Sequence, residues 1–147
     1  MKKQNIIFSL IALVFSLPAF AQPTAVITDP QKNYKEAKEL FIKKEYALAY
    51  PLLKEVKKAY PENQASNNRY IYEDINYYYI VCELKLRLPI AVEDAKKYID
   101  AVENDPRIEL ISYHLGKYYF IQGLYSDAIQ YYEAAGFNNL SEEEVSD

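Results

Sequence analysis

Three stretches of this chain share one pattern of small, aromatic and aliphatic residues, and this repetition constrains the fold more than any other feature. The copies cover about residues 37–61, 81–106 and 115–135, the middle one being the least regular. Within each copy, apolar residues recur three and four positions apart, the spacing of one face of an α-helix. Each copy therefore indicates a pair of short amphipathic helices. A helix pair repeated along a chain is typical of a stacked solenoid, so the sequence predicts an all-α fold.

The small residues of the first and third copies keep one spacing. Ala49 and Ala128 each lie twelve residues after another small residue, which is Ala37 in the first copy and Gly116 in the third. Helix axes approach to about 8–10 Å, depending on the side chains at the contact. We therefore expect the two helices of each pair to cross at these small residues.

The second copy departs from this spacing. Ala95 lies thirteen residues after Cys82 rather than twelve, so we expect one extra residue in its turn. In this alignment Cys82 takes the place of Ala37 and Gly116, which favours a small buried residue over a reactive thiol. Because Cys82 is the only cysteine in the sequence, no disulfide can form within the chain.

The same pattern predicts where the second helix begins and ends and which residues form the core. Pro51 is expected in the first turn of that helix, where proline is tolerated, and Pro61 is expected to end it. The predicted core is a stripe of apolar residues spread over all three copies: Leu40, Ala49, Leu53, Val56, Val81, Ala95, Ile99, Leu115, Tyr119, Ala128 and Tyr132.

The first 21 residues have the layout of a secretory signal peptide. A basic start at Lys2 and Lys3 precedes an apolar run over 6–17, and small residues lead up to Ala21. The alternative is a membrane anchor, but this run is shorter than the roughly 20 residues that a spanning helix needs. We therefore expect cleavage after Ala21 and an exported protein, periplasmic or envelope-associated in a Gram-negative bacterium.

The remaining sequence divides into a linker, the repeats and a short acidic end. We assign 22–30 to a linker and 31–140 to the repeats, which cover about 31–61, 70–106 and 108–137. In residues 141–147, Ser141 and Glu144 form a capping-box pattern typical of a helix start. We expect a further helix there that continues beyond this sequence; the alternative is a frayed acidic tail.

Charge and composition exclude one class of partner. The formal net charge is −4 for the whole chain and −6 once Lys2 and Lys3 are removed. No basic stripe is available to neutralise phosphates, so we do not expect nucleic-acid binding. Half of the residues are hydrophobic and about a quarter are charged, which is a composition that can bury a core.

The repeat pattern resembles the tetratricopeptide repeat (TPR) family. The third copy carries the closest match: Leu115, Gly116, Tyr119, Tyr125, Ala128, Tyr132 and Ala135. The first copy matches through Ala37, Leu40, Tyr46, Ala49, Leu53, Val56 and Pro61. The resemblance implies a right-handed solenoid of about three antiparallel helix pairs, whose first helices line a concave groove for a peptide or protein partner. At larger scale the chain is similar to the N-terminal regions of long exported TPR proteins of Bacteroidetes-like bacteria.

The resemblance also implies which residues face the groove, on the first helix of each pair. These candidates are Tyr34, Lys38 and Phe41 in the first copy, Tyr79 and Glu83 in the second, and Tyr113, Lys117 and Phe120 in the third. Tyrosine suits such a surface because it covers apolar area and keeps a hydroxyl group. The alternative is that these aromatic residues are packed in the core. The family's carboxylate-clamp pattern, which needs Asn in this row, is not reproduced.

The sequence offers little chemistry for catalysis. His114 is the only histidine, and one histidine with one distant cysteine does not make a zinc site. The sequence contains no nucleophile elbow or phosphate loop among its three glycines. We expect no enzyme activity, metal, cofactor or small-molecule substrate. The expected function is a non-catalytic protein-interaction scaffold, and the alternative is a structural spacer at the front of a longer envelope or sensor protein.

Overall fold

The computed structural model describes residues 29–61, 69–136 and 140–141. This part of the chain folds into six α-helices and contains no strand, which confirms the all-α prediction. The helices are α2 (Pro30–Ile42), α3 (Tyr46–Ala59), α4 (Arg69–Leu86), α5 (Ala91–Ala101), α6 (Arg107–Ile121) and α7 (Tyr125–Ala135). The expected signal peptide, nearly all of the expected linker and residues 142–147 lie outside the described residues.

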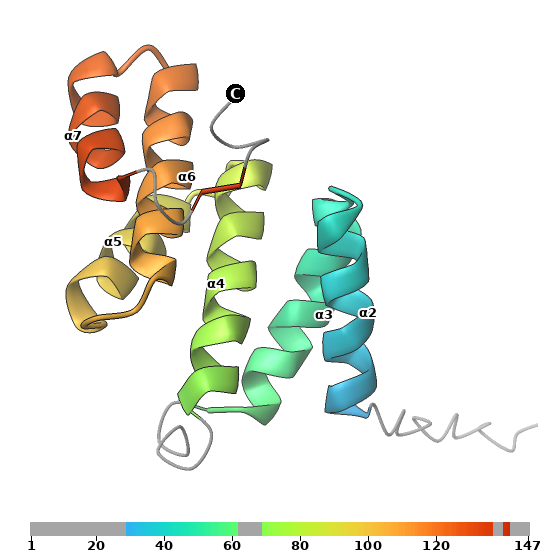
Figure 1. Ribbon diagram of the computed structural model, residues 1–147. Coiled ribbons are helices and arrows are strands. Elements are labelled where there is room, and N and C mark those ends of the chain that lie inside the picture. The colour runs from blue at the N-terminus through green and yellow to red at the C-terminus, as the bar shows by residue number, and fades with distance from the viewer. Residues whose placement is uncertain (1–28, 62–68, 137–139, 142–147) are drawn as a thin grey trace, which may run out of the picture.

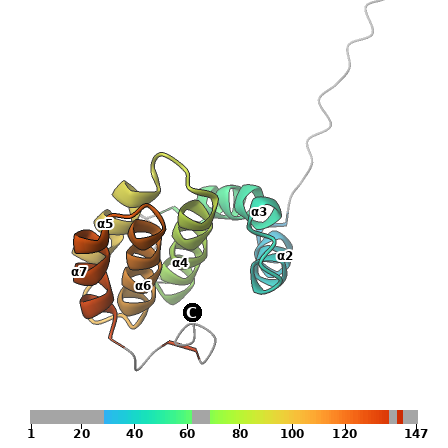
Figure 2. The ribbon, with the colours of Figure 1, turned by 90° about the horizontal axis from the view of Figure 1, so that it is seen from above.

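The helices pack in the order of the chain. Each helix contacts the next one, and α4 also contacts α2 and α6. Seen from above, α4 and α6 stand side by side in the middle, with α2 and α3 at one end and α5 and α7 at the other (Figure 2). The first helices of the three pairs, α2, α4 and α6, therefore form a continuous row (Figure 1).

The crossing of α6 and α7 depends on a missing side chain. A Cβ atom placed on Gly116 would lie 2.9 Å from Cδ1 of Tyr132 and 3.2 Å from the backbone oxygen of Ala128. In the first pair, Ala37 and Ala49 are both fully buried. The expected role of small residues at the crossings is thus confirmed in these two pairs.

All three helix pairs turn in the same way. Lys44, Arg87 and Gly123 adopt positive φ values of 61°, 55° and 77°. The amide of the residue after each one donates a hydrogen bond to the carbonyl five residues earlier, at 2.9–3.0 Å, as in a Schellman-type helix end. The turn has four residues between α4 and α5, and three in each of the other pairs. The turn between α4 and α5 is thus one residue longer than the other two.

The turn residues correct the alignment of the second copy. Seven positions before each left-handed residue stand Ala37, Ile80 and Gly116. Ile80 therefore corresponds to the two small residues, and the prediction that Cys82 does so is wrong. Cys82 is fully buried, as expected, but it packs with the first helix pair. Neither Lys44 nor Arg87 is a residue that marks such a turn in the sequence, so the error could not be seen there.

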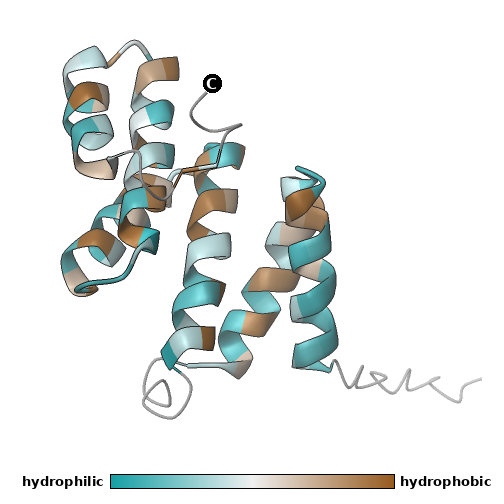
Figure 3. Cartoon of the chain, viewed as in Figure 1, coloured by the Kyte–Doolittle hydropathy of each residue, from teal (hydrophilic) through white to brown (hydrophobic). Residues whose placement is uncertain are grey.

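Two clusters of buried side chains form the core. The smaller cluster joins α2, α3 and α4 through Ala37, Ala49, Leu53 and Cys82. The larger cluster joins α4, α5, α6 and α7, and contains Ile80, Val81, Leu84, Ala91, Ala95, Tyr98, Ile111, Leu115, Tyr119 and Ala128. All members of the predicted core stripe are buried or half-buried. Apolar residues also reach the surface at the C-terminal ends of α2 and α6 (Figure 3), where Ile42 and Ile121 are exposed.

The start of α3 differs from the prediction. The helix begins at Tyr46, so Pro51 lies in its second turn rather than its first. Because proline has no amide hydrogen, the carbonyl of Ala47 loses its usual helical donor. Pro51 is exposed, which leaves that carbonyl side of the helix open to water.

We predict that Gly116→Val destabilises the protein by about 1–3 kcal/mol, the usual cost of adding atoms to a packed crossing. The valine side chain would collide with the Tyr132 ring and with the backbone of α7. Chemical denaturation followed by circular dichroism measures the change in the free energy of unfolding. Gln130→Val, at an exposed position of α7, is the control for the low helix propensity of valine. Equal losses in both variants would contradict a close crossing at Gly116.

Candidate functional site

A cavity of about 440 Å³ lies between the three first helices, and we call it the central groove. It is bordered by the end of α2, the middle and end of α4, the middle of α6 and the start of α3. Its lining residues are Phe41, Ile42, Lys44, Tyr46, Tyr77, Tyr78, Lys85, Tyr113, His114 and Ser141. Its volume is within the range of ligand sites in proteins, about 300–1,000 Å³.

Aromatic rings form one wall of the central groove. The ring of Phe41 meets those of Tyr46 and Tyr78 edge-on, with centroids 5.4 and 4.8 Å apart. Tyr77 and Tyr78 are in edge contact at 5.1 Å. Edge-to-face pairs at these separations are favourable beyond the area that they bury. The wall is therefore held by ring contacts between α2, α3 and α4.

Two lysines stand among the described residues that line the central groove. Among the described residues that line it, the charged side chains are those of Lys44 and Lys85, and none is Asp or Glu. The pKa of His114 is lowered to about 3. The larger cause is burial, and the second is the positive charge of Lys85 and Lys117. His114 is therefore neutral at physiological pH. The groove thus combines apolar rings with two cations.

All eight candidate residues lie on the first helices α2, α4 and α6. Phe41 and Tyr113 line the central groove. Lys117 is half-buried on α6, close enough for its charge to act on His114. Phe120 is 54% exposed at the end of α6, with its ring centroid 5.6 Å from that of Tyr125. Tyr34 and Lys38 lie nearer the start of α2.

The two candidates on α4, Tyr79 and Glu83, contact α3 and are not among the lining residues of the central groove. Tyr79 stacks on Tyr50 with ring centroids 5.1 Å apart, and the two hydroxyl groups are 3.0 Å apart. The Tyr50 hydroxyl also donates to Oε1 of Glu83 at 3.0 Å, and Glu83 is fully buried. Their expected place on the groove face is therefore wrong, because they belong to the interface of α3 with α4.

The error arose because the second copy was aligned two residues too far along the sequence. Counting from the left-handed turn residues places Tyr77 level with Tyr34 and Tyr113, and Lys85 level with Ile42. Tyr77 and Lys85 line the groove, together with Tyr78 of the same helix. The recurring tyrosine was a usable signal in the sequence, but the run 77–79 offered three tyrosines and no turn marker to choose among them.

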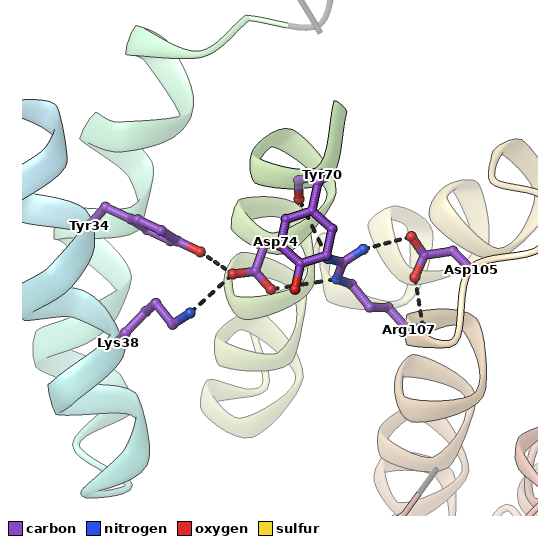
Figure 4. A network of polar contacts seen from close by, with 6 residues as sticks. All are labelled: Tyr34, Lys38, Tyr70, Asp74, Asp105 and Arg107. Atoms are coloured by element: carbon purple, nitrogen blue, oxygen red, sulfur yellow. Dashed lines mark hydrogen bonds and ion pairs between the residues drawn. The ribbon is translucent and has the colours of Figure 1, made fainter. Parts of the chain in front are cut away.

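A polar network joins the same three helices near their other end (Figure 4). Asp74 of α4 accepts hydrogen bonds from the hydroxyl of Tyr34 and, at 3.1 Å, from Nζ of Lys38. On its other side, Nε of Arg107 lies 3.5 Å from Oδ1 of Asp74. Asp74 therefore links α2 and α6 through one carboxylate. Its side chain is 15% exposed, which limits screening of these contacts by water.

Arg107 is itself held by Asp105, which lies in the loop before α6. Its guanidinium donates to Oδ2 of Asp105 at 2.6 Å, and its backbone amide donates to Oδ1 of the same residue at 2.8 Å. The guanidinium also lies 4.5 Å from the ring centroid of Tyr70. Burial opposes the charge of Arg107, but the carboxylates of Asp105 and Asp74 outweigh it and raise the pKa. The cation is thus fixed in place.

The pKa values of the α2 partners respond to the same carboxylate. Burial and then the hydrogen bond to Asp74 raise the pKa of Tyr34, so its hydroxyl keeps its proton. For Lys38, burial works against the charged form, but the hydrogen bond to Asp74 and the neighbouring Tyr78 raise the pKa overall. Both groups therefore stay in the protonation state that donates to Asp74.

A second cavity, of about 370 Å³, lies between α4 and α5. Glu73, Asn76 and Tyr98 line it and are each at least nine-tenths buried. Burial raises the pKa of Glu73. Charges of both signs border this cavity, among them those of Arg69 and Asp94. Lys57 of α3 also borders it, so this cavity touches two helix pairs, whereas the central groove is bordered by all three.

Within the described residues, no group of three or more His, Cys, Asp or Glu side chains is placed to hold a metal ion. Within the same part of the chain, no helix combines the length and apolar character needed to cross a membrane. Comparisons of the chain with protein-family models, with curated proteins and with solved structures found no match.

We predict that His114 makes the protein lose stability as the pH falls below its ordinary pKa of 6.5. Because the folded pKa is about 3, the unfolded chain binds more protons between these values, and the free energy of unfolding falls with falling pH. At about 1.4 kcal/mol per pH unit, the contribution of His114 should be about 2 kcal/mol smaller at pH 5 than at pH 7.

Denaturation of wild type and His114→Gln at several pH values between 5 and 7 measures this contribution. The difference between the two proteins isolates His114 from buried carboxylates such as Glu73, whose raised pKa acts in the opposite direction. A difference that stays constant over this range would mean that His114 can be protonated in the folded protein.

Proposed function

We propose that the protein is a non-catalytic interaction scaffold that binds an extended segment of a partner protein in the central groove. The observation that carries this proposal is that one cavity touches α2, α4 and α6 together. A bound segment would then contact all three helix pairs at once. Aromatic side chains are enriched where proteins bind one another, because they cover a large area with little entropy to lose.

We also propose that the fold is a TPR-like right-handed solenoid of three antiparallel helix pairs. Three features support this. The turns at Lys44, Arg87 and Gly123 have the same hydrogen bonds. The α4 helix contacts both α2 and α6, as expected when neighbouring repeats stack. Tyrosine recurs at the same place of each first helix when the copies are aligned on these turns.

The absence of catalysis is likewise a proposal, and the states of the reactive side chains support it. His114 is 6% exposed and neutral, so it is poorly suited to accept a proton at neutral pH. Burial raises the pKa of the Cys82 thiol to about 12, which keeps it from acting as a nucleophile. Export to the periplasm or envelope remains a proposal based on the first 21 residues.

The competing proposal is a structural spacer at the front of a longer envelope protein. The polar network around Asp74 favours a rigid body, which suits either role. The two proposals differ in one respect: a spacer needs no partner in the central groove.

The test is site-specific photo-cross-linking in the source organism. A photoreactive phenylalanine analogue replaces Ile42, which lines the groove and is 73% exposed. The matched control replaces Ile129 of α7, which is 57% exposed and is not among the lining residues. We expect a defined adduct with another protein from position 42 only, reduced at least severalfold by Lys85→Glu. Equal labelling from both positions, or none from either, would favour the spacer.

A further inference from the structure

The second cavity, between α4 and α5, has three buried polar side chains in its lining. They are Glu73 and Asn76 of α4 and Tyr98 of α5, each at least nine-tenths buried, and we call them the floor. The volume of about 370 Å³ is within the range of sites for small ligands. Among the described residues, this cavity shares none of its lining with the central groove.

One carboxylate oxygen of the floor lacks a partner. Oε1 of Glu73 lies 3.7 Å from Nε of Arg69, which is longer than a usual hydrogen bond. Oε2 of Glu73 is buried and makes no hydrogen bond within the described part of the chain. Most buried polar atoms in proteins have a hydrogen-bond partner, so this atom needs an explanation. A ligand that donates a hydrogen bond inside the cavity would supply the partner.

Burial also disfavours the negative charge of Glu73. It raises the pKa of the carboxyl group, although Tyr98 and the positive charge of Arg69 act in the opposite direction. A further positive charge beside Oε2 would stabilise the carboxylate. The group that suits this position is therefore an ammonium group, because it is both a cation and a hydrogen-bond donor.

The more exposed part of the lining, which we call the rim, carries positive charges. Arg69 and Lys97 belong to it: the side chain of Arg69 is 68% exposed, and Lys97 is exposed as well. Lys57 of α3 is a third cation in the lining, whereas its acidic residues are Glu73 and Asp94. A ligand with a positive charge alone would be repelled by these cations. The ligand therefore needs an anionic group as well.

The two charged groups of the ligand have to be close together. The carboxylate of Glu73 and the guanidinium of Arg69 are neighbours, at 3.7 Å. A ligand that pairs with both must carry its ammonium and its carboxylate at a similar separation. An ammonium and a carboxylate on the same carbon atom meet this requirement.

We propose that this cavity binds a small zwitterion of the α-amino acid class, with its ammonium group at Glu73 and its carboxylate at Arg69 and Lys97. Ile80 and Val102 add apolar surface to the lining, which suits an aliphatic side chain on the ligand. The proposal concerns binding alone and involves no chemical step. It is independent of the proposed function, which concerns the central groove.

Isothermal titration calorimetry of the full chain tests the proposal. The probes are free leucine, isoleucine and valine, together with leucinamide, which lacks the carboxylate, and isocaproic acid, which lacks the ammonium group. Glu73→Gln keeps the size of the floor residue and removes its charge. Lys97→Gln changes an exposed rim residue, where folding is not at risk. The matched control is Lys54→Gln, at an exposed position of α3 that is not in the lining.

We expect saturable binding of at least one of the three amino acids, and no binding of the two analogues at the same concentration. Glu73→Gln should weaken binding about tenfold or more, because hydrogen bonds to charged groups are the stronger ones. Lys97→Gln should weaken it about two- to fivefold, the range of an exposed ion pair. Lys54→Gln should bind like wild type.

The proposal is overturned if none of the three amino acids binds saturably. Equal affinities for leucine and leucinamide would also overturn it, since the rim would then have no role. The same holds for equal affinities of wild type and Glu73→Gln. Should Glu73→Gln fail to fold, an unchanged affinity in Lys97→Gln would decide against the proposal. None of these results bears on cross-linking from position 42, so the proposed function is tested separately.

Discussion

The arrangement of the three first helices depends on one half-buried carboxylate, that of Asp74. Asp74 receives Tyr34 and Lys38 from α2 and faces Arg107 from α6, so it joins helices that are far apart in the sequence. A charge this well shielded needs its partners, because a buried ion left alone costs several kcal/mol. Arg107 likewise needs its acidic partners, because its side chain is only 9% exposed. The helices are therefore held at a spacing that leaves a cavity at their other end.

That cavity has a chemistry which follows from the repeat. Phe41 and Lys85 come from the ends of α2 and α4, and Tyr113 and His114 come from the middle of α6. Ring contacts then form the wall, and the lysines supply charge at the surface. We propose an extended segment of a partner protein as the occupant of this groove.

Much of the fold could be predicted because it depends on periodic local patterns. Helix spacing, the small residues Ala49 and Gly116 and the core stripe are all visible in the sequence. The groove was predicted less well, since its α4 residues depend on where a left-handed turn falls, and Arg87 gives no sign of that. Nor can a pattern show that Asp74 and Arg107, 33 positions apart in the sequence, meet across two helices.

The most direct test of this account is the distance between α2 and α6, measured by pulsed electron resonance. Spin labels on cysteines at Glu39 and Ile121, both exposed, would be placed in a Cys82→Ala background. The account predicts one narrow distance distribution, and a clearly broader one when Asp74→Ala is added. An unchanged distribution in the Asp74→Ala protein would contradict the claim that this carboxylate holds the helices and shapes the groove.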